Sequence, residues 1–157
     1  MPDPAAAAAP PAEAVLEPLL PIIDPHHHLW DLPGSRYLLP ELLADTGSTD
    51  AQGARHDIRA TVFVECAAMH RAGGPEALRP VGETEFVNGI AAMSASGLYG
   101  PTRVAAGIVA FADLRRGAAV RDVLEAHIDA ARGRFRGIRH AAAWHADPRI
   151  RRSHSKP

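Results

Sequence analysis

The sequence predicts an α/β protein with parallel strands, and two observations carry this prediction. Short apolar runs typical of buried strands alternate along the chain with stretches whose apolar residues recur at helical spacing. Such alternation is typical of parallel sheets joined by right-handed crossovers. The predicted order, β-α-β-α-β-α-β, fits either an open doubly wound sheet or part of a TIM (β/α)₈ barrel. A complete barrel takes about 250 residues, so the four strands of this 157-residue chain would make half of one.

Four segments are expected to be strands, at residues 22–26, 59–66, 103–111 and 135–139. The second is the clearest, because it is rich in Val, Phe and Thr and is apolar on both faces. Helices are expected at 37–43, at 82–96 and from Asp113 to Gly133. Asp113 is a plausible N-cap, and Gly133 is a plausible stop. Pro33 and Gly34 mark a loop between the first strand and the first helix.

Three regions differ in composition. Residues 1–20 form an Ala/Pro-rich arm that we expect to be disordered, residues 21–148 the folded unit, and residues 149–157 a basic, unstructured tail. The N-terminus lacks the basic and apolar regions of a signal peptide, and no apolar run reaches the length of a membrane span. A single cysteine, Cys66, excludes an internal disulfide and fits a reducing compartment. We therefore expect a cytoplasmic protein without membrane contacts.

Charge is unevenly distributed along the chain. Residues 1–114 hold 6 Arg against 14 Asp and Glu, whereas residues 115–157 hold 11 Arg and Lys against 4 acids. A basic end can bind nucleic acid. No aromatic residues interleave the tail, so we favour a solvated helix and tail over a nucleic-acid-binding module.

Histidines at the end of the first strand are the main candidates for chemistry. Alternate residues of a strand share a face, which predicts that Asp24, His26 and His28 project together while His27 points away. In a parallel α/β sheet they would lie at the carboxyl end, where such folds place their sites. Two imidazoles there can bind one divalent cation, with zinc, iron, nickel and copper all suitable. The alternative is an exposed loop that happens to contain three histidines.

Four segments in order resemble one family. They are IDPHHHLWD (23–31), VFVEC (62–66), PVGETEFVNG (80–89) and FRGIRH (135–140). The first is similar to the first-strand motif of the amidohydrolase superfamily, and the set resembles the amidohydrolase-related family that includes lactonases. The resemblance covers about residues 21–150 and implies the N-terminal half of a TIM barrel with its site at the carboxyl-terminal mouth.

The resemblance also implies a chemistry. His26 and His28 would be metal ligands, with zinc the expected ion, and the reaction would be opening of a lactone or related cyclic ester or amide by metal-activated water. The family's later histidines and its general-base aspartate have no counterpart in this sequence, and some lactonases of the group work without a metal. Glu65, Arg139 and His140 are candidate substrate-binding residues, Arg139 for a carboxylate. For Glu65 a salt bridge with Arg139 is an equally weighted alternative, and for Arg139 the alternative is an ordinary surface arginine.

Two further expectations concern single residues, and two concern the whole chain. His127 lies on the apolar face of a helix and is interpreted as a core histidine, and Cys66 as a small core residue and not a nucleophile.

We expect the isolated chain to be inactive, and to be marginally stable or aggregation-prone unless its open barrel edges pair with a second copy or with a complementary half. The alternative function is a non-catalytic remnant with no enzymatic role.

Overall fold

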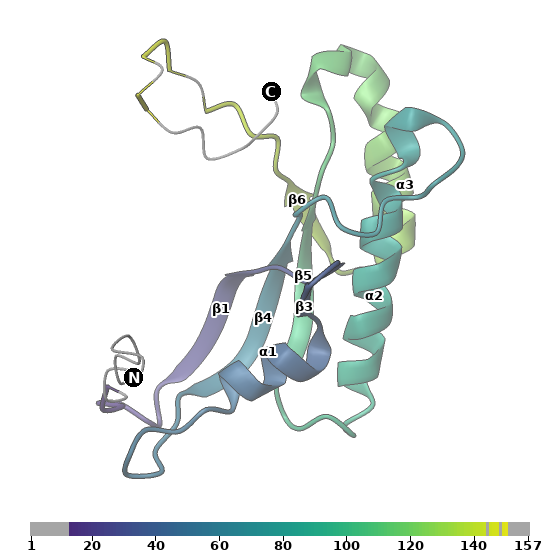
Figure 1. Ribbon diagram of the computed structural model, residues 1–157. Coiled ribbons are helices and arrows are strands. Elements are labelled where there is room, and N and C mark those ends of the chain that lie inside the picture. The colour runs from purple at the N-terminus through teal and green to yellow at the C-terminus, as the bar shows by residue number, and fades with distance from the viewer. Residues whose placement is uncertain (1–12, 144, 148, 151–157) are drawn as a thin grey trace.

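The computed structural model describes residues 13–143, 145–147 and 149–150. Four strands form one sheet in the order β1-β4-β5-β6, and each neighbouring pair is parallel (Figure 1). Their bounds are Pro21–His27 for β1, Asp57–Val64 for β4, Arg103–Ala110 for β5 and Phe135–Ile138 for β6. The α/β class and the four predicted strands are thus confirmed. Spatial order follows chain order, with β1 and β6 at the two edges.

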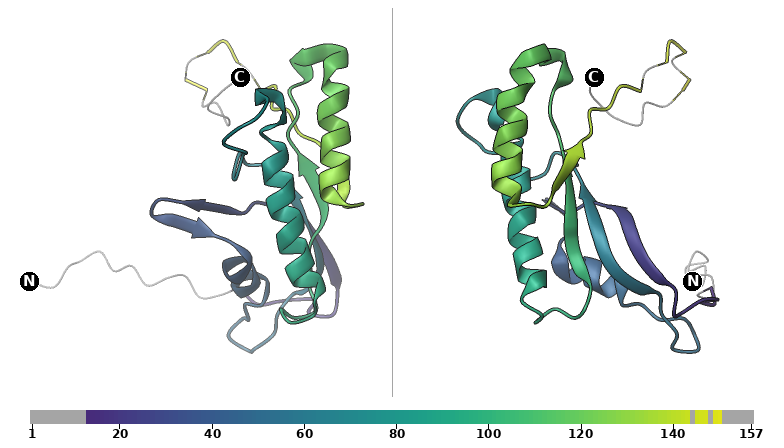
Figure 2. Two further views of the ribbon diagram at one scale, coloured as in Figure 1. Left: turned by 90° about the vertical axis from the view of Figure 1, so that its right-hand side faces the viewer. Right: turned by 180° about the vertical axis from the view of Figure 1, so that it is seen from behind.

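The helices lie together on one side of this sheet. They are α1 (Leu39–Thr46), α2 (Val81–Ala95) and α3 (Arg121–Ala131), with short 3₁₀ segments η1 (Glu76–Leu78) and η2 (Leu114–Val120). Seen from behind, β1, β4 and β5 have no helix over them (Figure 2). In the part of the chain that the structure describes, helices therefore cover one face of the sheet and leave the other face open.

The ends of the last helical region match their sequence signals. The Asp113 carboxylate accepts the Arg115 backbone N–H at 3.0 Å, so Asp113 caps this region, although its first turns are the 3₁₀ segment η2. The helix α3 ends at Ala131, and Arg132 (φ 44°) and Gly133 (φ 85°) then adopt left-handed conformations. Glycine reaches this conformation without steric cost, which explains the stop.

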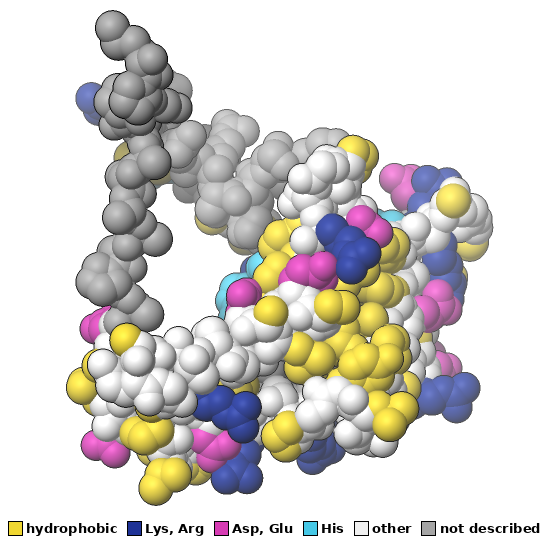
Figure 3. Space-filling view, turned by 60° about the horizontal axis from the view of Figure 1, so that its bottom comes forward, with side chains coloured by type: hydrophobic (Ala, Val, Ile, Leu, Met, Phe, Trp, Pro, Cys, Tyr) yellow, Lys and Arg dark blue, Asp and Glu magenta, His cyan; other side chains and the backbone are white. Residues whose placement is uncertain are grey.

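The core fills the space between the sheet and its helices. Cα pairing aligns Phe63 with Ile108 and Ile108 with Phe135, so one row of large side chains faces the helices. Phe63 and Ile108 are fully buried, whereas Val62 and Val109 are only half-buried. Apolar surface also reaches solvent: hydrophobic side chains gather near the centre of one face, among charged ones (Figure 3).

A two-stranded hairpin occupies the segment expected to be a loop. Its strands, β2 (Trp30–Leu32) and β3 (Ser35–Tyr37), are antiparallel and turn at Pro33 and Gly34, where Gly34 has φ 77°. The Trp30 and Tyr37 rings stack with centroids 5.1 Å apart, which stabilises this short pair. Because Tyr37 belongs to the hairpin, α1 begins at Leu39 and not at the predicted Tyr37.

The predicted arm and tail are only partly described. Residues 13–20 form no helix or strand, and the Val15 N–H donates to Asp50 Oδ2 at 2.9 Å. The expected disorder over residues 1–12, and the expected tail from residue 151 onward, lie outside the described residues. Within the described ranges, no helix combines the length and apolar character needed to cross a bilayer.

Candidate functional site

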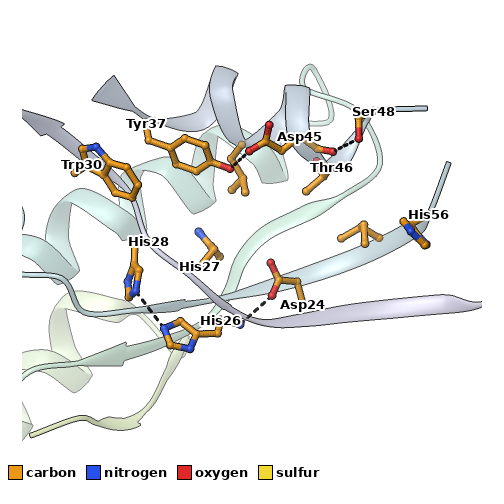
Figure 4. Close-up of a pocket in the computed structure, with 12 residues that line it drawn as sticks. Asp24, His26, His27, His28, Trp30, Tyr37, Asp45, Thr46, Ser48 and His56 are labelled. Atoms are coloured by element: carbon orange, nitrogen blue, oxygen red, sulfur yellow. Dashed lines mark hydrogen bonds between the residues drawn. The ribbon is translucent and has the colours of Figure 1, made fainter. Parts of the chain in front are cut away.

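The candidate ligands flank an irregularity at the carboxyl end of β1. Asp24 aligns with Thr61 and His27 with Phe63, so three steps along β1 match two along β4. The His26 N–H donates to Asp24 Oδ1 at 3.0 Å inside this bulge. The extra residue reverses the strand's alternation. Asp24 and His26 therefore lie on opposite sides of β1 (Figure 4), and Asp24 does not share the histidine face as simple alternation predicted.

His26 and His28 remain together on that face. Their Nε2 atoms are 3.1 Å apart, and their rings meet edge to face. The other ring nitrogen of His28, Nδ1, lies 2.7 Å from the Val64 carbonyl oxygen at the end of β4. A carbonyl oxygen only accepts, so Nδ1 carries the proton and Nε2 of His28 presents a lone pair toward His26.

This arrangement fits two ligands of one metal ion. Metal–nitrogen bonds of about 2.0–2.1 Å span the 3.1 Å between the Nε2 atoms at an angle of roughly 95–100° at the metal. Such an angle lies between octahedral and tetrahedral values. Donation of the second ring N–H to a backbone carbonyl is the usual way in which proteins orient a metal-binding histidine. Among the described residues, no group of three or more His, Cys, Asp and Glu side chains is placed to hold an ion.

Glu65 and Arg139 contact each other. The Nε of Arg139 donates to Glu65 Oε1 at 2.6 Å, and its Nη2 donates to the Glu65 backbone oxygen at 2.5 Å. This pair connects the ends of β4 and β6 across β5, where Arg139 N–H also donates to the Ala110 oxygen. Two of the three guanidinium nitrogens are thus occupied within the chain. The geometry matches the salt-bridge alternative and leaves Nη1 for any ligand.

His140 faces the segment after β5 and not the histidine pair. Its Nδ1 accepts the Leu114 N–H at 3.0 Å, and its ring meets that of Phe111 edge to face. The Asp113 carboxylate lies 3.9 Å from the same nitrogen. His140 therefore helps to hold the start of η2, and the structure does not bring it together with His26 and His28.

A cavity of about 430 Å³ lies between β1 and the α1 side of the molecule. Asp24, His27, Tyr37 and Asp45 are among the residues that line it (Figure 4). The Tyr37 hydroxyl donates to Asp45 Oδ2 at 2.5 Å, and burial together with this carboxylate raises the Tyr37 pKa. The tyrosine therefore stays protonated and acts as a hydrogen-bond donor to Asp45.

His27 is a buried structural residue. It is only 6% exposed, and its Nε2 lies 2.9 Å from the Thr61 hydroxyl, which in turn accepts the Ala105 N–H at 2.9 Å. Ala105 has φ 50° at an irregular point of β5, so the hydroxyl replaces a sheet hydrogen bond there. Burial lowers the His27 pKa and favours the neutral ring.

Glu83 is the residue that the sequence reasoning missed. Its Oε1 accepts the N–H groups of Cys66 and Ala68, both at 2.9 Å, while Oε2 is buried without a partner in the described part of the chain. Burial raises the Glu83 pKa, against the effect of the two N–H donors. The acceptor supports a turn that contains the left-handed Ala67 (φ 63°). A Glu in the first turn of a helix is too common a pattern to indicate this role.

His127 and Cys66 have the roles expected of them. The fully buried His127 places Nε2 2.9 Å from the Phe111 oxygen and Nδ1 2.8 Å from the Thr84 hydroxyl. Burial lowers its pKa, so the ring is a neutral bridge between α3, α2 and the end of β5. Burial raises the pKa of the Cys66 thiol to about 11. A thiol with such a pKa is a poor nucleophile near neutral pH.

Comparison with known proteins adds one relative. The chain is 34% identical over 137 residues to the uncharacterized protein y4mH of Sinorhizobium fredii (strain NBRC 101917 / NGR234). The alignment covers 80% of this chain but only 41% of the relative, so the chain spans about two fifths of the relative's length. No family model matches the chain. No solved structure matches it either.

Proposed function

We propose that the chain carries part of the site of a metal-dependent hydrolase of the amidohydrolase type, acting on a lactone or a related cyclic ester or amide. One observation carries the proposal: the Nε2 atoms of His26 and His28 lie 3.1 Å apart, while His28 Nδ1 is held by the Val64 oxygen. Once the proton that His26 Nε2 donates to His28 Nε2 is moved to His26 Nδ1, the pair offers two oriented lone pairs to one cation. Imidazole donors suit zinc, iron, nickel and copper, and the resemblance to the amidohydrolase-related family makes zinc the expected ion among them.

The topology favours the wall of a (β/α)₈ barrel rather than a doubly wound sheet. Strand order follows chain order without reversal, and all helices lie on one face. A doubly wound sheet would reverse its order and carry helices on both faces, whereas a (β/α)₈ barrel has helices outside and side chains of the open face inside. The histidine pair lies at the carboxyl end, where barrel enzymes place their sites. We therefore propose that the four strands are half of such a barrel.

The side chains of this chain would bind and orient the reactants. A divalent cation held by His26 and His28 would supply an activated water and polarise a carbonyl near neutral pH. His28 is kept in the required tautomer by Val64. The Nη1 of Arg139, which has no hydrogen-bond partner among the described residues, could bind a substrate carboxylate, with Glu65 holding the guanidinium in place. Further ligands and a general base would come from protein corresponding to the part of the relative that this chain does not span.

A titration with Co²⁺, a spectroscopic substitute for zinc, tests the proposal. Chain free of metal should develop visible absorption bands on addition of cobalt, and Zn²⁺ should displace them. His26→Ala and His28→Ala should each weaken binding at least tenfold, since even loss of an orienting partner costs about that much. His56→Ala, which removes an exposed histidine outside the pair, is the control.

The results also separate the two candidate functions. Binding that is unchanged in both alanine variants would contradict the metal site. A non-catalytic role is the second candidate, because no third ligand is placed beside the pair among the described residues. It predicts no cobalt binding at the pair and no lactone hydrolysis, even when the chain is combined with the remaining part of a longer relative.

A further inference from the structure

The two edge strands are open and carry opposite charge. The sheet ends at β1 on one side and at β6 on the other, so each has one row of backbone N–H and C=O groups without a strand partner in the described chain. Residues 13–31 contain four acids (Glu13, Glu17, Asp24 and Asp31) and no Arg or Lys. Residues 130–146 contain four arginines (Arg132, Arg134, Arg136 and Arg139) and no acid. We call these segments the acidic strip and the basic strip.

Most of these charges lack an opposite partner. Within the described residues, no ion pair involves any acid of the acidic strip, and of the four arginines only Arg139 has a carboxylate partner. Arg134 instead donates to the Asn88 side chain, and Arg136 donates to the backbone oxygens of Gly133 and Phe135. An external partner of opposite charge would stabilise both strips.

Apolar side chains are exposed beside the acidic strip. Leu16 (86%), Leu19 (87%) and Leu20 (57%) are open to solvent just before β1, and Ile23 (64%) is open to solvent within it. A strand edge with uncovered apolar groups is a template for pairing with another strand. Charge and apolar surface thus point to an occupant that itself offers a basic strand edge.

We infer that the occupant is a second copy of this chain, bound so that β1 of each copy pairs in parallel with β6 of the other. A two-fold axis along the strands makes both contacts at once and gives a closed dimer with eight strands and no free edge. The charges match in order: Glu17 and Arg134 precede their strands, Asp24 and Arg136 lie within them, and Asp31 and Arg139 follow them.

The dimer has a consequence for the histidine pair. Because all strands run in one direction, the His26 and His28 pairs of both copies lie at the same end of the assembly. Each pair then adjoins the carboxyl end of the other copy's β6, where Arg139 and His140 follow the strand. The inference rests on the half-barrel geometry proposed above and does not depend on a bound metal.

The test uses two double variants and light scattering coupled to size exclusion. The unchanged chain should have twice its 16.7 kDa mass, and its dimer should weaken with added salt. Arg134→Glu/Arg136→Glu reverses two charges of the basic strip, and Glu17→Arg/Asp24→Arg reverses the two acidic charges that face them in the other copy. Each variant alone should be monomeric, whereas an equimolar mixture should form a heterodimer. Arg116→Glu, on the exposed η2 segment, should leave the dimer intact.

Three outcomes would overturn the inference: a monomeric unchanged chain, double variants that remain dimeric, or a mixture that stays monomeric although both variants are folded by circular dichroism. A monomer would instead favour pairing with the remainder of a longer polypeptide. The cobalt titration keeps the two proposals separate. A monomer that binds cobalt at His26 and His28 contradicts only the dimer, and a dimer that binds none contradicts only the metal site.

Discussion

The His28 ring is hydrogen-bonded through Nδ1 to the Val64 carbonyl oxygen, 2.7 Å away, and this contact connects the ends of β1 and β4. His26 has no such anchor: its only side-chain hydrogen bond in the described residues is to His28. The two histidines therefore differ in structural role, although the Nε2 atoms of both rings point toward each other.

This difference predicts unequal effects on stability without metal. His28→Ala should lower the free energy of unfolding by about 0.5–1.5 kcal/mol, because it removes a half-buried hydrogen bond. His26→Ala should change it by less than about 0.5 kcal/mol, as is usual for an exposed residue. Urea unfolding in the presence of a chelator measures both. Equal losses would show that the Val64 contact does not anchor the ring.

Two glycines of α2 predict opposite effects of the same substitution. A Cβ at Gly82 would lie 2.6 Å from the Met69 oxygen and 2.7 Å from the Arg71 nitrogen, both backbone atoms, whereas a Cβ at Gly89 would meet nothing within 4 Å. Gly82→Ala should destabilise the chain by about 1–3 kcal/mol through this overlap. Gly89→Ala should stabilise it by roughly 0.5–1 kcal/mol, since alanine is the better helix former. Thermal unfolding of the two variants gives the comparison, and a stabilising Gly82→Ala would contradict the close approach.

Glu83 predicts a stability that falls as pH rises. The pKa of Glu83 is raised in the folded chain, so the folded state keeps the Glu83 proton to higher pH than the unfolded state does. The stability that this protonation contributes therefore declines as pH rises above the ordinary glutamate pKa of about 4.3. Glu83→Gln keeps the acceptor for the Cys66 and Ala68 N–H groups and should remove this component. Glu83→Ala leaves both donors without a partner and should cost about 1–3 kcal/mol for each.

The midpoints of urea unfolding at pH 5 and pH 8 test this predicted effect of Glu83 on stability. The unchanged chain should lose more stability between these values than Glu83→Gln does, and Glu83→Ala should be the least stable of the three at pH 5. A Gln variant with the same pH slope as the unchanged chain would contradict the assignment.

His127 predicts the opposite pH dependence. Burial lowers its pKa, so the unfolded state binds the proton first, and stability falls as pH drops below the ordinary histidine value of about 6.5. His127→Phe should remove this loss of stability at low pH. It should also cost about 1–3 kcal/mol, because the Thr84 hydroxyl and the Phe111 oxygen lose their partner. The difference in unfolding free energy between the two proteins should narrow from pH 7.5 to pH 5.5, and a constant difference would count against a neutral bridge.

Much of the fold could be predicted because local pattern and tertiary context agree. The run from Arg59 to Cys66 is β-branched and aromatic, and the structure has β4 there; Gly133 follows α3 where its stop signal lies. The hairpin at Trp30–Tyr37 was missed because three-residue strands carry almost no periodicity. Its stability comes from a ring stack across the turn, which spacing alone does not reveal.

The site was less predictable than the fold. Strand alternation correctly brings His26 and His28 to one face, but it also placed Asp24 there, and the bulge between Asp24 and His27 moves the carboxylate to the other face. A bulge depends on the register with β4 and leaves no mark in the sequence of β1. The Glu65–Arg139 contact joins residues 74 positions apart. Only the order of strands in the sheet brings these residues together.

The Val64 contact also bears on how the histidine pair would change over evolutionary time. The atom that orients His28 belongs to the main chain, and every amino acid supplies a carbonyl oxygen at that place. Substitutions at position 64 that preserve the strand therefore leave the ring's acceptor in place. Divergent relatives could therefore carry another buried apolar residue there and still keep the geometry of the pair, so the identity of residue 64 is a poor guide to whether a relative retains it.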